Sequence, residues 1–289
     1  MVDRRVLLKL LEVHDLPTLP AIVSNILETV ADETSSAGDL TELLERDHAI
    51  SAHLLRLANS AFYGFPHRVD SVRQGVVVLG FNETRCLALA TSVFSTVAKR
   101  QQIALDPEDF WMHSFGAAKA AQILSEKYCR ESGRERCYTV GLLHDIGKYV
   151  LALVLKADYK DIVDRAKATG RALTEIESER LGMTHAQVGR WLADKWRLPA
   201  IVGNVIANLH HARVYSGADK KIVAAVAIAD VLSAKARFGF AGESEDPNVD
   251  TELLQILDLP QEKFDSFVTE LTSLREETRQ FLHVLKGGA

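Results

Sequence analysis

The chain has 289 residues, of which 47% are hydrophobic and 25% are charged, and its formal net charge is −5. This composition is typical of a folded globular protein and excludes extensive disorder. The negative charge argues against a broad nucleic-acid-binding face, because duplex binding depends on Lys and Arg side chains that neutralise phosphates. It leaves room for a small anionic ligand in a local pocket.

The N-terminal segment starts with basic residues, but Lys9, Glu12 and His14 interrupt the apolar run that follows. It therefore predicts an amphipathic helix and not a signal peptide. We expect no apolar run of membrane-spanning length in the chain. The three cysteines form no CxxC pair, which argues against a disulfide framework and against a thiolate zinc site. Together these features predict a cytoplasmic protein with no membrane partner.

Apolar residues recur with helical spacing along most of the chain, for example over residues 22–30. Alternating strand patterns are scarce, so we expect an all-α, multi-helix fold. Residues 103–107 interrupt the pattern, and we place a boundary there between an N-terminal helical half, 1–105, and a C-terminal half, 106–289. The segment 239–250 concentrates Gly, Pro and acidic residues and predicts an exposed loop.

Two pairs of polar residues have the spacing of a capping box, Ser71 with Gln74 and Thr184 with Gln187. Such a pair satisfies free backbone amides at a helix start, so helices are expected to begin after Ser71 and Thr184. Helix ends are expected where the periodic pattern stops, at Gly80, Gly170, Gly182 and Pro199.

Several residues of the N-terminal half form a recognisable set: Leu16, Pro17, Leu19, Pro20, Asp47, Leu54, Leu55, Asn59, Ser60, Ala61, Leu79 and Gly80. Together they resemble the front of the HDOD family, whose name stands for HD-related output domain. HDOD domains are signalling modules of bacteria, so the resemblance implies a signalling or scaffolding role with a partner protein. We expect Asp47, Asn59 and Tyr63 to pack and cap helices, with ligand binding as the alternative.

Seven residues of the C-terminal half offer metal-ligand atoms, and they follow one another as His113, His144, Asp145, His185, His210, His211 and Asp230. Imidazole nitrogen and carboxylate oxygen are ligands for zinc, iron and manganese. A pair of octahedral metals needs about eight protein donors, which seven residues supply when one Asp bridges. Each single histidine could instead be a hydrogen-bonded core residue, but the joint pattern favours a metal site.

The surroundings of these residues are apolar. His144 and Asp145 lie in the stretch VGLLHDIGKYV, and Asp230 lies in VAAVAIADVLSA. A buried, unpaired Asp costs several kcal/mol, so each of these carboxylates needs a cation or hydrogen-bond donors. A metal ion meets this need.

The order of the ligands resembles the HD superfamily of metal-dependent phosphohydrolases. In that superfamily a spaced His, an adjacent His-Asp pair and a distal Asp hold the first metal, and here these would be His113, His144, Asp145 and Asp230. The resemblance covers about residues 107–238.

Three further histidines, His185, His210 and His211, are similar to those of the HD-GYP subgroup of cyclic di-GMP phosphodiesterases. The resemblance implies two divalent metal ions bridged by Asp145, iron first, with manganese, zinc or nickel as substitutes. Lys148 would then contact a phosphate, its alternative being an ordinary surface lysine. HD-GYP proteins continue with a DGxGYP run, whereas this chain reads ARVYSGADKK, which argues against cyclic di-GMP hydrolysis.

Three functional hypotheses follow. The first is a signalling module whose intact HD-type metal site sets a conformation. The second is a phosphohydrolase acting on a nucleotide or another phosphodiester, with Asp145 and Lys148 as its catalytic residues. The third is oxygen-dependent di-iron chemistry, which the His-rich ligand set disfavours. The absent GYP run favours the first, with a signalling protein or a small phosphate-containing molecule as partner.

Overall fold

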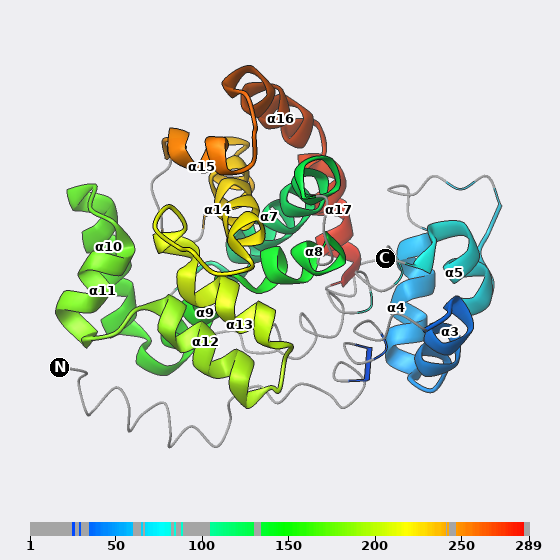
Figure 1. The fold of residues 1–289 in the computed structure, drawn as a ribbon. Helices are drawn as coiled ribbons and strands as arrows, with labels where there is room; N and C mark the ends of the chain where they lie inside the picture. Colours follow the sequence, from blue (N-terminus) through cyan, green and yellow to red (C-terminus); the bar gives the residue numbers. More distant parts are fainter. Residues whose placement is uncertain are drawn as a thin grey trace. The chain divides into compact units, whose positions relative to one another are not determined.

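The computed structural model describes residues 25–26, 29, 35–59, 65, 67–81, 84, 88, 105–129, 134–240, 242 and 247–285. All regular structure in these residues is helical and none is strand, which confirms the predicted all-α class (Figure 1). The predicted N-terminal amphipathic helix and the predicted role of Tyr63 lie outside the described residues, as do Leu16, Pro17, Leu19, Pro20, Ser60 and Ala61.

The chain divides into two compact units. The larger unit takes residues 1–16, 100–195 and 200–275, and the smaller takes 17–99, 196–199 and 276–289. The boundary placed between residues 105 and 106 stays a prediction, because residues 89–104 are not described.

In the smaller unit the described helices are α3 (Ala37–Glu45), α4 (His48–Ala58) and α5 (Val72–Leu79), together with most of α17 (Arg275–Leu285). Asn59 fixes the loop between α4 and α5: its Nδ2 donates to the Val69 carbonyl at 2.8 Å, and its Oδ1 accepts from the Val69 amide at 2.8 Å. Asp47 accepts a hydrogen bond from the Ile50 amide at 3.0 Å, at the start of α4. Asp47 and Asn59 thus make packing and capping contacts.

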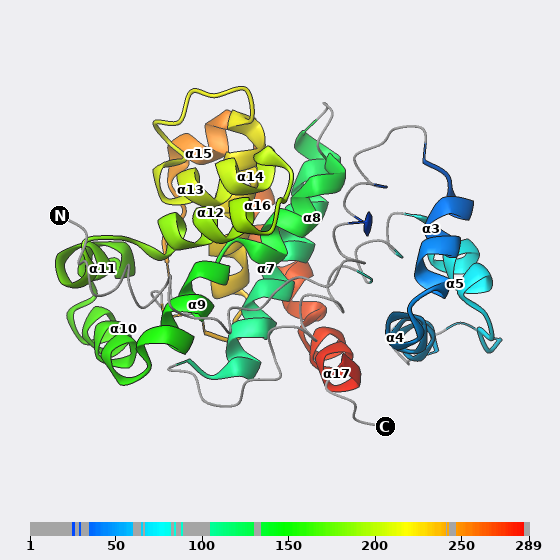
Figure 2. The ribbon, with the colours of Figure 1, turned by 90° about the horizontal axis from the view of Figure 1, so that it is seen from below.

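The larger unit holds α7 (Pro107–Tyr128), α8 (Arg134–Leu143), α9 (Ile146–Leu155), α10 (Ala157–Thr169), α11 (Leu173–Leu181), α12 (His185–Lys195), α13 (Ala200–Asn208), the short 3-10 helix η1 (Leu209–His211), α14 (Lys220–Lys235), α15 (Thr251–Ile256) and α16 (Gln261–Ser273). Helix α7 packs against α8 and α14 in the middle, α9 packs against α12, and α12 packs against α13. Helices α10 and α11 form a pair at one end of the unit (Figures 1 and 2).

The helix boundaries follow local chemistry. Thr184 and Gln187 form the expected capping box, since each side chain accepts from the other's backbone amide, at 3.4 and 2.9 Å. Ser71 also caps its helix, but the Gln74 side chain accepts from the Asp70 amide instead of the Ser71 amide. The three predicted glycine ends all have positive φ: Gly80, Gly170 and Gly182.

Two expectations need correction. The helical stretch Cys137–Leu155 is, by length and composition, apolar enough to cross a membrane, although 89% of it is buried inside the protein. The stretch forms part of the core. It holds most of α8 and all of α9, and the His144-Asp145 pair separates the two helices. The described residues of the predicted loop 239–250 form no helix, and Asn248 and Asp250 are exposed as expected, but Gly242 is buried.

Close helix approaches depend on residues without side chains. A Cβ atom on Gly147 in α9 would overlap the carbonyl oxygen of His185 and lie 2.8 Å from the Gly189 amide nitrogen. A Cβ atom on Gly141 in α8 would lie 2.8 Å from Ala118 Cα of α7. Because these neighbours are backbone atoms, they can move away only if a whole helix moves.

We therefore expect Gly147→Ala to destabilise the protein by about 1–3 kcal/mol through overpacking. Gly75→Ala in α5 is the control, because its Cβ would meet only side chains at 3.7 and 3.8 Å. That change should leave stability unchanged or raise it by about 0.5–1 kcal/mol, since Ala favours helix more than Gly does. Urea unfolding followed by circular dichroism measures the stability of both variants. Equal unfolding midpoints for Gly147→Ala and Gly75→Ala would contradict the close contact of α9 with α12.

Candidate metal centre

Six of the seven predicted ligands converge in the core of the larger unit, and they form two groups. The first group, called site A, is His113, His144, Asp145 and Asp230. The second group, called site B, is Asp145, His185 and His210. In each group one ligand atom per residue lies within 4.8 Å of all the others. Asp145 belongs to both groups.

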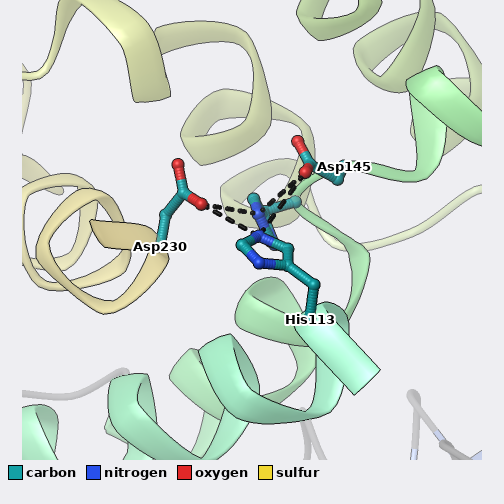
Figure 3. A group of neighbouring side chains, drawn as sticks. His113, Asp145 and Asp230 are labelled. Atoms are coloured by element: carbon teal, nitrogen blue, oxygen red, sulfur yellow. Dashed lines mark hydrogen bonds and ion pairs between the residues drawn. The ribbon is translucent and has the colours of Figure 1, made fainter. Parts of the chain in front are cut away.

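Site A brings two imidazole nitrogens and two carboxylate oxygens together. His113 Nε2 lies 3.0 Å from Asp230 Oδ1 and 3.7 Å from Asp145 Oδ2 (Figure 3). His144 Nε2 lies 3.5 Å from Asp230 Oδ1 and 3.3 Å from Asp145 Oδ2. The donors come from α7, the break between α8 and α9, and α14.

Site B uses the other oxygen of the shared carboxylate. Asp145 Oδ1 lies 3.6 Å from His185 Nε2, and His185 Nε2 lies 2.7 Å from His210 Nε2. Two imidazole nitrogens therefore face each other beside one carboxylate oxygen. Asp145 presents Oδ2 to site A and Oδ1 to site B, which is the arrangement that a bridging carboxylate needs.

The site residues other than His210 are buried. The side chains of His144, Asp145 and His185 are 0% exposed, and that of Asp230 is 8% exposed. Two of the buried polar atoms in the described part of the chain that lack a hydrogen-bond partner are His144 Nε2 and Asp145 Oδ1, one at each site. Each such atom costs about 1–3 kcal/mol if it stays unsatisfied. Divalent cations fit these residues, because they would satisfy both atoms.

Local structure leaves the His144 and Asp145 side chains free of helix-capping roles, so that they could bind a metal ion. The two residues occupy the break between α8 and α9, and Asp145, the N-cap residue of α9, makes no side-chain capping bond. His144 Nδ1 contacts the Gly141 carbonyl oxygen at 2.7 Å. Since a carbonyl only accepts, Nδ1 carries the proton and, in the neutral ring, Nε2 offers its lone pair to site A.

Lys148 is fully buried, so the surface-lysine alternative is wrong. Its Nζ donates to Asp145 Oδ2 at 2.7 Å. Burial alone would raise the pKa of Asp145, but His144 and Lys148 outweigh burial and hold that pKa well below its usual range. The shared ligand is therefore an ionised carboxylate.

The pKa values of His144 at site A and His210 at site B are shifted in opposite directions. Burial would lower the pKa of His144, but the neighbouring Asp145 and Asp230 carboxylates outweigh it and raise that pKa well above its usual value. Burial, followed by His185 and Lys148, lowers the pKa of His210 to about 3. His210 is consequently neutral near pH 7, as a metal-ligating imidazole must be.

Glu177 is a buried polar residue that the sequence analysis did not find. Its Oε2 accepts from the His185 amide and contacts His185 Nδ1, both at 2.8 Å, and its Oε1 accepts from the Tyr159 hydroxyl at 2.6 Å. Burial raises the pKa of Glu177, but His185 and the Tyr159 bond outweigh burial and lower it. The sequence held a signal: Leu173, Ile176, Glu177 and Leu181 share one apolar helix face.

The remaining predicted ligand, His211, lies outside both groups, and its side chain is exposed. It follows His210 in the short 3-10 helix η1. Neighbouring residues of a 3-10 helix point about 120° apart, so when His210 faces site B, His211 faces elsewhere.

The fold and the site together define an all-α protein with buried His and Asp groups that could hold a metal ion. A family model described as the HDOD domain matches residues 16–212, more than half of the chain. The chain therefore belongs to the HDOD family, as its N-terminal residues had suggested. The match ends before Asp230, so it does not establish the HD-GYP-like character of the C-terminal half.

Known proteins resemble this chain over most of its length. An HDOD domain protein of unknown function from Geobacter sulfurreducens is 26% identical, with a TM-score of 0.78 and 93% of each chain covered. A protein from Shewanella amazonensis SB2B, provisionally named a phosphohydrolase, is 26% identical, with a TM-score of 0.71, 96% of this chain and 98% of that chain covered.

This chain matches only part of each of two curated relatives. An uncharacterized protein of Treponema pallidum (strain Nichols) is 25% identical over 233 residues, which is 76% of this chain and 42% of the relative. The uncharacterized protein YuxH of Bacillus subtilis (strain 168) is 31% identical over 72 residues, 18% of its length. The chain thus spans less than half of either curated relative.

If Asp145 bridges two cations, Asp145→Ala should empty both sites, whereas His210→Ala should empty site B alone. His211→Ala is the matched control, because it removes the adjacent, exposed imidazole. Elemental analysis after metal loading should give about two ions per chain for wild type and control, about one for His210→Ala and none for Asp145→Ala. Unchanged metal content in Asp145→Ala would refute the bridge.

Proposed function

We propose that this chain is a bacterial signalling protein of the HDOD family that carries a dinuclear metal centre of the HD type. The proposal rests mainly on the orientation of the Asp145 carboxylate: its Oδ2 faces site A and its Oδ1 faces site B. The six converging residues would hold two divalent ions. Iron is the first choice, and manganese, zinc or nickel suit the same imidazole and carboxylate donors.

The charge of the buried centre indicates what else it binds. The carboxylates of Asp145, Asp230 and Glu177 with the Lys148 ammonium leave a formal charge of −2 when the imidazoles are neutral. One divalent cation balances this charge, and two leave an excess of +2. Because an uncompensated buried charge is costly, a doubly loaded centre should take up an anion. A small phosphate-containing ligand matches that requirement.

The burial of the ligands favours the signalling role over turnover of a bulky substrate. The site A ligands are at most 8% exposed, whereas the His210 residue at site B is partly exposed. A metal ion or a small anion needs little room to reach such a centre, but a cyclic dinucleotide would require the helices to separate. Occupancy of the centre would then stabilise one arrangement of the helices that a partner protein reads.

The second candidate function is that of a metal-dependent phosphohydrolase. The similar Shewanella protein, provisionally named as one, favours it. Bound divalent ions would supply Lewis acidity towards a phosphate ester and lower the pKa of a coordinated water. Lys148 Nζ, which is next to Asp145 Oδ2, would donate to a phosphate oxygen and stabilise its developing charge.

We infer a cytoplasmic protein, with a signalling protein or a small phosphate-containing ligand as its partner. The net charge of −5 supports the inference that duplex nucleic acid is not a partner. The burial of the Cys137–Leu155 stretch supports the inference that a membrane is not one either.

The test of this function combines metal content with turnover. Metal-loaded wild type is assayed for phosphate binding by calorimetry and for hydrolysis of bis-p-nitrophenyl phosphate and cyclic di-GMP. We expect about two ions per chain, phosphate binding that requires them, and no turnover. Turnover with bound metal would favour the phosphohydrolase, and a metal-free protein would refute the proposal.

Lys148→Met should retain both metal ions and weaken phosphate binding by about tenfold, which corresponds to about 1.4 kcal/mol. Met keeps most of the side-chain volume, so the change removes mainly the ammonium group. Lys160→Met is the control, because Lys160 forms an exposed ion pair with Asp164. Calorimetric titration of phosphate into the loaded proteins measures the effect, and equal affinities in all three would exclude a Lys148 contact.

A further inference from the structure

A chain of three buried side chains connects site B with the α10–α11 pair. Tyr159 of α10 donates to Glu177 Oε1 of α11 at 2.6 Å, and Glu177 Oε2 contacts both the backbone amide and Nδ1 of His185 in α12. Tyr159 and Glu177 are 0% exposed, and His185 is 1% exposed. Both oxygens of Glu177 are therefore occupied by neighbours of defined position.

This contact pattern determines how His185 presents itself to site B. A carboxylate accepts hydrogen bonds only, so the proton of the neutral ring lies on Nδ1, and Nε2 offers its lone pair. The second bond, to the His185 amide, ties Glu177 to the backbone that carries the ring. His185 Nε2 is thereby held 2.7 Å from His210 Nε2 and 3.6 Å from Asp145 Oδ1.

Site A is supported differently. It has two carboxylates as direct ligands, Asp145 and Asp230, and behind His144 stands the backbone carbonyl of Gly141 instead of a carboxylate. Site B has only the shared Asp145 carboxylate and two imidazoles. Since a ligand set with one shared carboxylate attracts a cation less strongly than a set with two, site B depends more on how well its histidines are oriented and on how basic they are.

We propose that Glu177 is a positioning residue that sets the metal affinity of site B and leaves site A unchanged. The inference rests on the proposed dinuclear centre. Glu177 fixes the tautomer and ring orientation of His185, and Tyr159 fixes Glu177 in turn. Carboxylates behind a ligating histidine typically contribute 10–100-fold in metal affinity. The α10–α11 pair thus controls the second metal position without supplying a ligand.

Glu177→Gln tests the inference, with Glu175→Gln as its matched control. Glu175 lies on the same helix, but its carboxylate pairs with Arg171 at the surface. Titration of Mn²⁺ into metal-free protein should show two binding steps in the wild type and in the control. In Glu177→Gln the tighter step should be unchanged and the weaker step should lose about 10–100-fold in affinity. Tyr159→Phe should shift the same step in the same direction by less.

A second readout needs no metal. Nitrogen NMR of the metal-free wild type should place the His185 proton on Nδ1, and Glu177→Gln should give a mixture of the two tautomers. A purely structural role of Glu177 at the start of α12 would lower stability without changing the tautomer. If Glu177→Gln does not fold, the Mn²⁺ titration and the tautomer measurement are made on Tyr159→Phe, which removes only one hydroxyl.

The outcomes separate this inference from the proposed function. Two wild-type binding steps that remain unchanged in Glu177→Gln would overturn the inference and leave the metal centre intact. Equal weakening of both steps would also overturn it, because the effect would not be specific to site B. A wild type that binds no Mn²⁺ and none of the other candidate metals would refute the centre itself, while the tautomer measurement would still report whether Glu177 holds His185.

Discussion

The larger unit is organised around one ionised carboxylate with no access to water. Asp145 lies where α8 ends and α9 begins, and its charge can be stable there only beside compensating groups. Lys148, one turn further along α9, provides one positive charge. The histidines reach the two oxygens from opposite sides. Helices α7, α9, α12 and α14 and the 3-10 helix η1 each contribute a side chain to this centre.

Small residues bring the ligand-bearing helices close enough. Gly147 lets α9 lie against the backbone of His185 at the start of α12, and Gly141 lets α8 approach Ala118 of α7. These close contacts restrict how far α9 can separate from α12, which carries His185, and α8 from α7, which carries His113. A site that is held by such packing needs little reorganisation to bind its ion, which raises affinity. The separate packing of α7 against α14 brings His113 and Asp230, which are 117 positions apart, within 3.0 Å of each other.

Sequence reasoning could predict the helical class and six converging ligands, because both leave local traces: periodic apolar residues, and His or Asp inside apolar runs. It could not decide between the neighbours His210 and His211, since that choice depends on the direction of a single 3-10 turn. It missed Glu177, whose partner is eight residues away. The buried position of Lys148 was also not evident, because a lysine after a glycine in HDIGK has no distinctive local pattern. In each case the direction of a side chain was missed, because that direction is determined by tertiary packing and not by the local sequence.

The two proposed metal positions have different ligand sets, and this difference bears on the proposed function. Site A has two carboxylates, so an ion bound there would stabilise the fold. Site B has one shared carboxylate and the partly exposed His210. A cation at site B would carry the excess charge that an anionic ligand neutralises. Its occupancy would therefore respond both to the anion and to the hydrogen bonds that Glu177 makes from α11. Reversible filling of site B, dependent on its surroundings, would suit the signalling role that we propose.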